Sequence, residues 1–96
     1  MTKLTETQIQ ESLGGLGEWS EVSGAIQRTY EFTDFVEAIR FVNQIADEAE
    51  VRQHHPDILI RYNRVMLTLS THDAGGITTK DFALAEFADG LVAQGV

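Results

Sequence analysis

The strongest constraint on the fold is a stretch of strict alternation in the second half of the chain. Two apolar trios, each spaced by two, flank a two-residue connection: Ile58, Ile60 and Tyr62, then Val65, Leu67 and Leu69. Period-two spacing puts each trio on one face of an extended strand, and a two-residue connection closes a hairpin. We therefore predict a β-hairpin that turns at Asn63-Arg64, with Tyr62 opposite Val65 and both trios packed in the core.

The remaining sequence predicts a second hairpin and three helices. Alternation over residues 25–32 follows Ser23-Gly24, which indicates two antiparallel strands joined there. Apolar residues at three- and four-residue intervals predict a long helix from Phe35 to near Glu50. Capping-box patterns, Thr5 with Gln8 and Thr78 with Asp81, open a short first helix and a last one. The expected class is α+β, with a four-stranded antiparallel sheet, helices on one face, and the order α-β-β-α-β-β-α.

Size and composition limit what such a chain does. Its 96 residues provide one core, so residues 1–96 are expected to be a single domain. Fifteen acidic residues against seven basic ones repel nucleic acids and anionic membranes, and the lack of cysteine excludes disulfides and thiolate chemistry. No run of eighteen apolar residues occurs, and we expect a cytoplasmic protein without membrane contact. The last helix, over residues 82–92, is apolar around much of its circumference, which favours a homo-oligomer.

All three histidines lie in one segment, which is the first functional signal. They are His54, His55 and His72. Counting outward from a turn at Asn63-Arg64 puts His55 opposite His72, with Cβ atoms roughly 5 Å apart. Imidazole titrates near pH ~6.5, so such a pair suits concerted acid and base steps. The simpler interpretation is that these are ordinary loop histidines.

A metal site with Glu50 or Asp73 is the main chemical alternative for these histidines. It is disfavoured because adjacent side chains such as His54 and His55 diverge on an extended chain. We therefore expect no metal.

The histidines belong to a longer pattern with fixed intervals. It consists of Glu50, three residues, His54-His55-Pro56, five residues, an aromatic at Tyr62, nine residues, His72, eight residues and Asp81. This pattern resembles the pterin-4a-carbinolamine dehydratase family, also described as a dimerisation cofactor of a homeodomain transcription factor. The strings Leu67–His72 and Phe32–Phe35, and Trp19 before the first hairpin, resemble the family as well. The similarity covers residues 13–92.

The resemblance implies an enzyme that dehydrates 4a-hydroxytetrahydropterin to quinonoid dihydropterin and water, which recycles the pterin cofactor of aromatic amino-acid hydroxylases. It implies His54 and His72 as the general acid and base, and His55 as the residue that holds the pterin. Substrate-binding residues would be Glu50, Pro56, Trp19 and Thr71. No further cofactor is implied, and family members are dimers or tetramers. One departure is Gln53, where many members have an acidic residue.

Several of these residues also have plain structural interpretations. Glu50 would be a solvated carboxylate at a helix end, and Asp81 would cap the last helix. Trp19 and Tyr62 would pack in the core. Pro56 would end the irregular segment that precedes it. The alternative function is a non-catalytic pterin-binding or protein-interaction module with the same fold.

Overall fold

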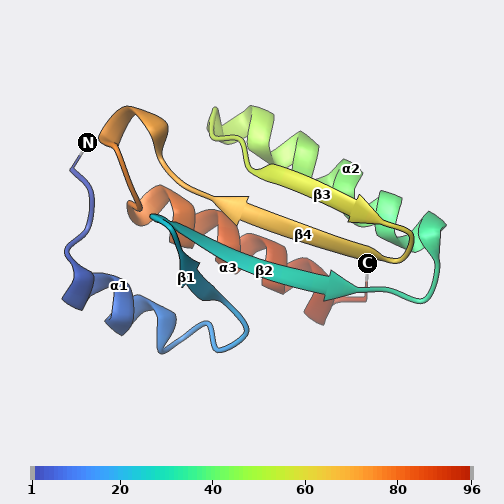
Figure 1. Cartoon of the computed structure of the whole chain (residues 1–96). Coiled ribbons are helices and arrows are strands. Elements are labelled where there is room, and N and C mark those ends of the chain that lie inside the picture. The colour runs from blue at the N-terminus through green and yellow to red at the C-terminus, as the bar shows by residue number, and fades with distance from the viewer. Residues whose placement is uncertain (1, 96) are drawn as a thin grey trace.

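The computed structural model describes residues 2–95 and confirms the predicted class and element order (Figure 1). Four strands form one antiparallel sheet in the order β1-β2-β4-β3. Figure 1 shows α2 and α3 behind this sheet, whereas its other face is turned to the viewer without a helix over it. The elements are α1 (Glu6–Leu13), β1 (Ser20–Val22), β2 (Ala25–Glu31), α2 (Phe35–Arg52), β3 (Asp57–Arg61), β4 (Arg64–Leu69), the short 3-10 helix η1 (His72–Ala74) and α3 (Thr79–Ala93).

The helices begin where the sequence places their caps. Thr5 and Gln8 form the capping box of α1, and Thr78 and Asp81 form that of α3. The carboxylate of Asp34 accepts a hydrogen bond from the backbone N–H of Glu37 at the start of α2. Each cap satisfies backbone donors that have no partner inside the helix, so local chemistry fixes where the helices meet the sheet.

The core fills the space between the inner face of the sheet and the helices. Apolar side chains from β2 and β4 alternate inward and pack against α2 and α3. This arrangement leaves the outer residues of the same strands on the uncovered face. The largest fully buried apolar side chains are Phe41, Ile26, Ile45, Leu67, Leu69, Leu84 and Val65.

One charged group is packed into the inner side of the sheet. Asp89 of α3 accepts hydrogen bonds at one carboxylate oxygen from Arg28 (2.7 Å), from the Tyr30 hydroxyl (2.5 Å) and from the Trp19 indole (3.0 Å). The Arg28 guanidinium also lies 4.2 Å from the centre of the Tyr30 ring. Burial raises the pKa of the Tyr30 phenol well above its usual value, and the neighbouring Asp89 carboxylate raises it further.

The second hairpin forms, but its predicted turn is wrong. Arg61 pairs with Arg64 and Ile60 with Val65, so the two turn residues are Tyr62 and Asn63. Asn63 is tied to the end of β2, because its side-chain amide donates to the Phe32 carbonyl (2.9 Å) and its own carbonyl accepts from the Phe32 N–H (2.8 Å). The positive φ therefore falls on Tyr62, at 51°.

The shift in register has a limited effect because it amounts to two residues. A two-residue shift keeps every side chain on its predicted face, whereas a shift of one would reverse them all. Val65, Leu67 and Leu69 are fully buried as predicted. Tyr62, predicted to pack in the core, is 67% exposed because it lies in the turn, and Ile60 is also exposed near the end of the edge strand β3.

Candidate active site

The way α2 ends determines how the paired histidines point. Gln53 follows the helix in the left-handed conformation, with φ 51° and ψ 44°. The N–H of the next residue, His54, donates back to the Ala49 carbonyl at 3.1 Å, which is the six-to-one bond of a Schellman ending. The chain therefore turns sharply before the histidines, and the two adjacent imidazoles point to opposite sides of it, as the sequence predicts.

His54 points into the protein. Only 9% of the residue is exposed, and its Nε2 lies 2.6 Å from Oδ1 of Asp81, which is fully buried. The other carboxylate oxygen of Asp81 accepts from the Thr71 hydroxyl and from the backbone N–H of Thr78, both at 2.9 Å. Asp81 is thus the predicted helix cap and, in addition, the partner of a histidine. It fixes the ring of His54 and leaves Nδ1 as the nitrogen not engaged by the carboxylate.

His55 points outward to a different carboxylate. Its Nε2 lies 2.5 Å from Oε2 of Glu50, one turn from the end of α2, and the side chains are 57% and 72% exposed. Both groups remain open to a ligand. Glu50, for which the sequence suggests either substrate binding or a solvated helix end, contacts a histidine.

His55 and His72 meet at a hollow on the uncovered face of the sheet. The hollow has a volume of about 200 Å³, and it is lined by His55, Asp57, Thr68, Ser70 and His72. The strand pairing counted from Asn63-Arg64 is wrong, since Asp57 lies opposite Thr68. The two rings still converge because His72 lies just beyond the end of β4, where η1 begins, next to the segment that leads into β3. We refer to this hollow as the histidine pocket.

Other residues expected from the sequence lie outside this lining. Trp19 is 4% exposed and bonded to Asp89, so it fills the core and is not a wall of the histidine pocket. Thr71 is buried, and its hydroxyl bonds to Thr78 and Asp81. Pro56 is half-buried between His55 and the first residue of β3.

Sequence reasoning missed Asp57, Thr68 and Ser70 as pocket residues. Alternation places Thr68, Ser70 and His72 on one face of the sheet, which is the signal for the two hydroxyl residues, whereas Asp57 joins them through its register with Thr68.

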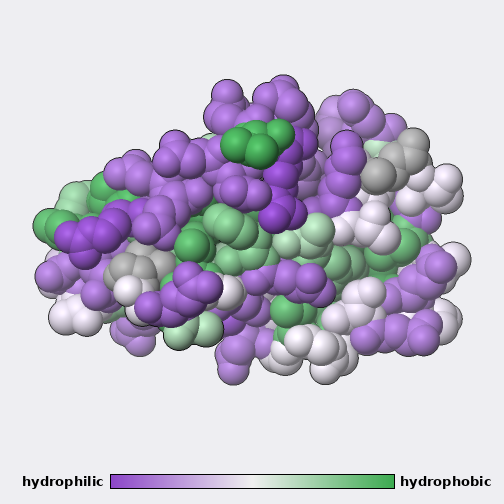
Figure 2. Space-filling view, turned by 180° about the vertical axis from the view of Figure 1, so that it is seen from behind, coloured by the Kyte–Doolittle hydropathy of each residue, from purple (hydrophilic) through white to green (hydrophobic). Residues whose placement is uncertain are grey.

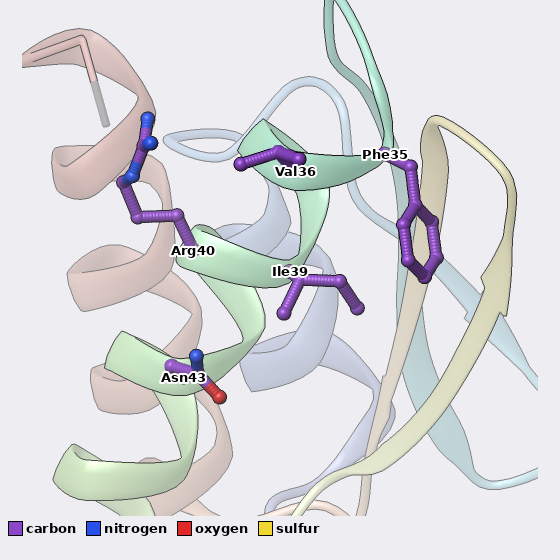
Figure 3. A pocket seen from close by; sticks show the side chains of 5 residues that line it. All are labelled: Phe35, Val36, Ile39, Arg40 and Asn43. Carbon is purple, nitrogen blue, oxygen red and sulfur yellow. The ribbon is translucent and has the colours of Figure 1, made fainter.

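The opposite, helical side of the molecule carries hollows of another kind. Figure 2 shows apolar surface gathered in a band between polar margins on this side. One hollow, of about 300 Å³, lies along the first turns of α2 and is lined by Phe35, Val36, Ile39, Arg40 and Asn43 (Figure 3). Its lining has no histidine or carboxylate, so it is unsuited to acid-base chemistry near neutral pH. The candidate active site is therefore the smaller histidine pocket.

Comparison with known proteins decides the family. The chain matches the family described as Pterin 4 alpha carbinolamine dehydratase over residues 2–91. The protein belongs to this family. A protein of Picosynechococcus named "Putative pterin-4-alpha-carbinolamine dehydratase" is 53% identical over 90 residues, which cover 94% of this chain and 98% of the relative.

Solved structures agree with that assignment. A crystal structure of a transcriptional coactivator/pterin dehydratase from Brucella melitensis is 38% identical, has a TM-score of 0.91, and is matched over 94% of this chain and 98% of the other. A pterin dehydratase-like protein described as a RuBisCO assembly factor in the alpha-carboxysome has a TM-score of 0.63 over 76% of this chain and 84% of the other. It is 20% identical, so it shows a shared fold alone.

Within residues 2–95, no helix is both long enough and apolar enough to cross a membrane. Nor does this part of the chain contain a group of three or more histidine, aspartate or glutamate side chains placed to share one metal ion.

Proposed function

We propose that this protein is a cytoplasmic hydro-lyase that dehydrates 4a-hydroxytetrahydropterin to quinonoid dihydropterin and water. The observation that carries the proposal is the meeting of His55 and His72 at one open pocket, while His54, the chain neighbour of His55, is held by a buried carboxylate. Membership of the dehydratase family supports the same substrate class. The enzyme would thereby return pterin cofactor to aromatic amino-acid hydroxylases.

The reaction needs two proton transfers and no change of oxidation state. A proton added to the 4a-hydroxyl lets it leave as water, and a proton removed from N5 lets the C4a–N5 double bond form. We assign these transfers to His54 and His72. His72 lines the pocket, and His54 retains Nδ1 for proton exchange at a side chain that is 10% exposed. General acid-base catalysis of this kind contributes about 10²–10⁴-fold to a rate.

We assign binding of the pterin to His55 and Glu50. His55 lines the pocket, and the exposed carboxylate of Glu50 that contacts it accepts hydrogen bonds while it holds the imidazole. Ser70 and Thr68 offer hydroxyls on the wall of the pocket toward the polar edge of the heterocycle. Asp57, opposite Thr68, supplies a second acceptor.

The test is a comparison of three single alanine variants in a dehydration assay without added metal. His54→Ala and His72→Ala should lower kcat by about 10²-fold or more with little change in KM, whereas His55→Ala should mainly raise KM. Ser20→Ala on β1 serves as an exposed control. Should His55→Ala lose kcat while His54→Ala keeps it, the two rings that line the pocket would perform the chemistry and our assignment would be wrong. No acceleration by the parent protein would overturn the function itself.

A non-catalytic pterin-binding or interaction module is the alternative function. Its support is the shared fold of the RuBisCO assembly factor. Fluorescence titration with an oxidised pterin, run beside the turnover assay, separates the two functions, because a module would bind the pterin without turnover.

We also propose that the protein forms homodimers or homotetramers. Much of the apolar surface of α3 is buried within the chain, since Leu84, Ala85 and Ala88 are fully covered. On α2, however, Phe35, Val36 and Val51 remain exposed, and Figure 3 shows the first two in the opening turn of this helix. Light scattering coupled to size-exclusion chromatography would give the mass, and a monomer at micromolar concentration would contradict this proposal.

A further inference from the structure

The uncovered face of the sheet carries three cross-strand rows that run away from the histidine pocket. Strand register aligns outward-facing residues of β2, β4 and β3, because directly opposite residues point to the same face. The first row is polar and adjoins the pocket, the second has an apolar centre, and the third is charged. The rows are Gln27–Thr68–Asp57, Thr29–Met66–Leu59 and Glu31–Arg64–Arg61.

The second and third rows enclose a hollow of their own. It has a volume of about 210 Å³ and is lined by Thr29, Leu59, Arg61, Arg64 and Met66. Successive rows lie two residues apart along the strands, or roughly 7 Å, so the charged row is about 14 Å from the row at the histidine pocket. The two hollows thus follow one another along the same face, with the Leu59–Met66 pair between them.

The charged row places two like charges directly opposite each other. Arg61 and Arg64 are register partners, an arrangement that is destabilising unless another group balances it. Glu31 lies 3.5 Å from Arg64, and all three side chains are exposed. Arg61 has no ion-pair partner within residues 2–95. Two positive charges against one negative charge leave a net charge of +1 on this row, in a chain whose formal net charge is −8.

We propose that Arg61 and Arg64 bind an anionic group, a phosphate or a carboxylate, at the end of the side chain of the pterin substrate. The pterin ring would occupy the histidine pocket, the linking atoms would cross Leu59 and Met66, and the two guanidiniums would hold the anion through charge-assisted hydrogen bonds. The side chains of Arg61 and Arg64 are long and bridge part of the separation. This inference rests on the proposed function, and it adds the class of substrate.

The experiment compares three 4a-hydroxytetrahydropterins that differ in the C6 side chain: a neutral methyl group, a phosphate ester, and a benzoyl-linked carboxylate. For Arg61→Gln/Arg64→Gln, KM should rise about tenfold with a charged side chain and stay unchanged with the methyl group. Arg61→Lys/Arg64→Lys keeps the charge and should lose only part of the affinity. Arg40→Gln, which removes an exposed arginine from α2, is the control. The phosphate and carboxylate arms show which anion is preferred.

A KM ratio between charged and neutral pterins that is the same in the parent and in the double glutamine variant would overturn the inference, while the proposed function would stand. If no pterin is turned over, the proposed function fails, and fluorescence titration with oxidised pterins still measures the charge preference. A change in oligomeric mass without a change in charge preference would assign the arginine pair to a subunit contact, and the inference would again be wrong.

Discussion

Replacing Asp81 with asparagine tests the link between the helix cap and the chemistry. One oxygen of Asp81 accepts from the backbone N–H of Thr78, a donor that cannot change its role. In Asp81→Asn the amide oxygen must therefore face Thr78, and the NH₂ group faces Nε2 of His54. Two donors cannot share that contact, so His54 must move its proton from Nε2 to Nδ1.

The magnitude follows from the contacts that change. The variant exchanges a charge-assisted hydrogen bond for a neutral one at a fully buried site, which should reduce the free energy of unfolding by about 1.5–3 kcal/mol. A domain of this size has a free energy of unfolding of about 5–14 kcal/mol, so the variant should fold. Nδ1 would no longer accept a proton, and kcat should fall by about 10²–10⁴-fold.

Urea unfolding followed by the fluorescence of Trp19, the single tryptophan, measures the stability, and dehydration kinetics on the same preparation measure kcat. Thr78→Ala is the matched control, because it removes the hydroxyl that accepts from the Lys80 N–H and contacts the Thr71 hydroxyl, and it leaves the contact of His54 with Asp81. It should reduce the free energy of unfolding by about 0.5–2 kcal/mol and leave kcat unchanged. If Asp81→Asn loses stability but keeps kcat within about twofold of the parent, Asp81 is only a cap and the reasoning is refuted.

Three further variants test other parts of the structure. In Tyr30→Phe the loss of the bond to Asp89 should lower the free energy of unfolding by about 1 kcal/mol at pH 7. The folded-state pKa of Tyr30 is raised, so above pH ~10 the phenol loses its proton in the unfolded parent but keeps it in the folded parent. The difference in free energy of unfolding between the parent and Tyr30→Phe should therefore shrink above pH ~10. Urea unfolding that gives the same difference at pH 7 and at pH 10.5 would contradict this. Tyr62→Gly removes a side chain from an exposed left-handed position and should raise the free energy of unfolding by about 0.5–1 kcal/mol. A lower free energy of unfolding in this variant would show that the tyrosine side chain packs against the protein. Glu50→Gln should raise the pterin KM severalfold while the free energy of unfolding stays within about 0.5 kcal/mol, since its contact with His55 is exposed; an unchanged KM would remove Glu50 from the site.

The sequence predicted the elements well because local chemistry determines them. The capping residues Thr5 and Thr78 lie at helix starts, and alternation located β2 and β4. The turn of the second hairpin was wrong because a tertiary contact, Asn63 with the Phe32 backbone, decides which residue takes the positive φ. No pattern within the hairpin reports that contact.

Only the part of the candidate site that follows from local sequence could be predicted. Its histidines, and Glu50 beside them, were visible as a spaced motif. The contact of His54 with Asp81 joins residues 27 positions apart, and periodicity alone does not show it. Trp19 is buried and bonded to Asp89 of α3, a contact that the order of elements does not reveal.

The left-handed residue at the end of α2 makes the site sensitive to chain length. Gln53 reverses the direction of the backbone in a single step, and of the two residues that follow it, His54 is buried and His55 is exposed. An insertion of one residue between positions 51 and 54 would put His54 in the outward position, and a deletion there would put His55 in the inward one. Such a protein would keep both imidazoles, yet present the wrong ring to the substrate.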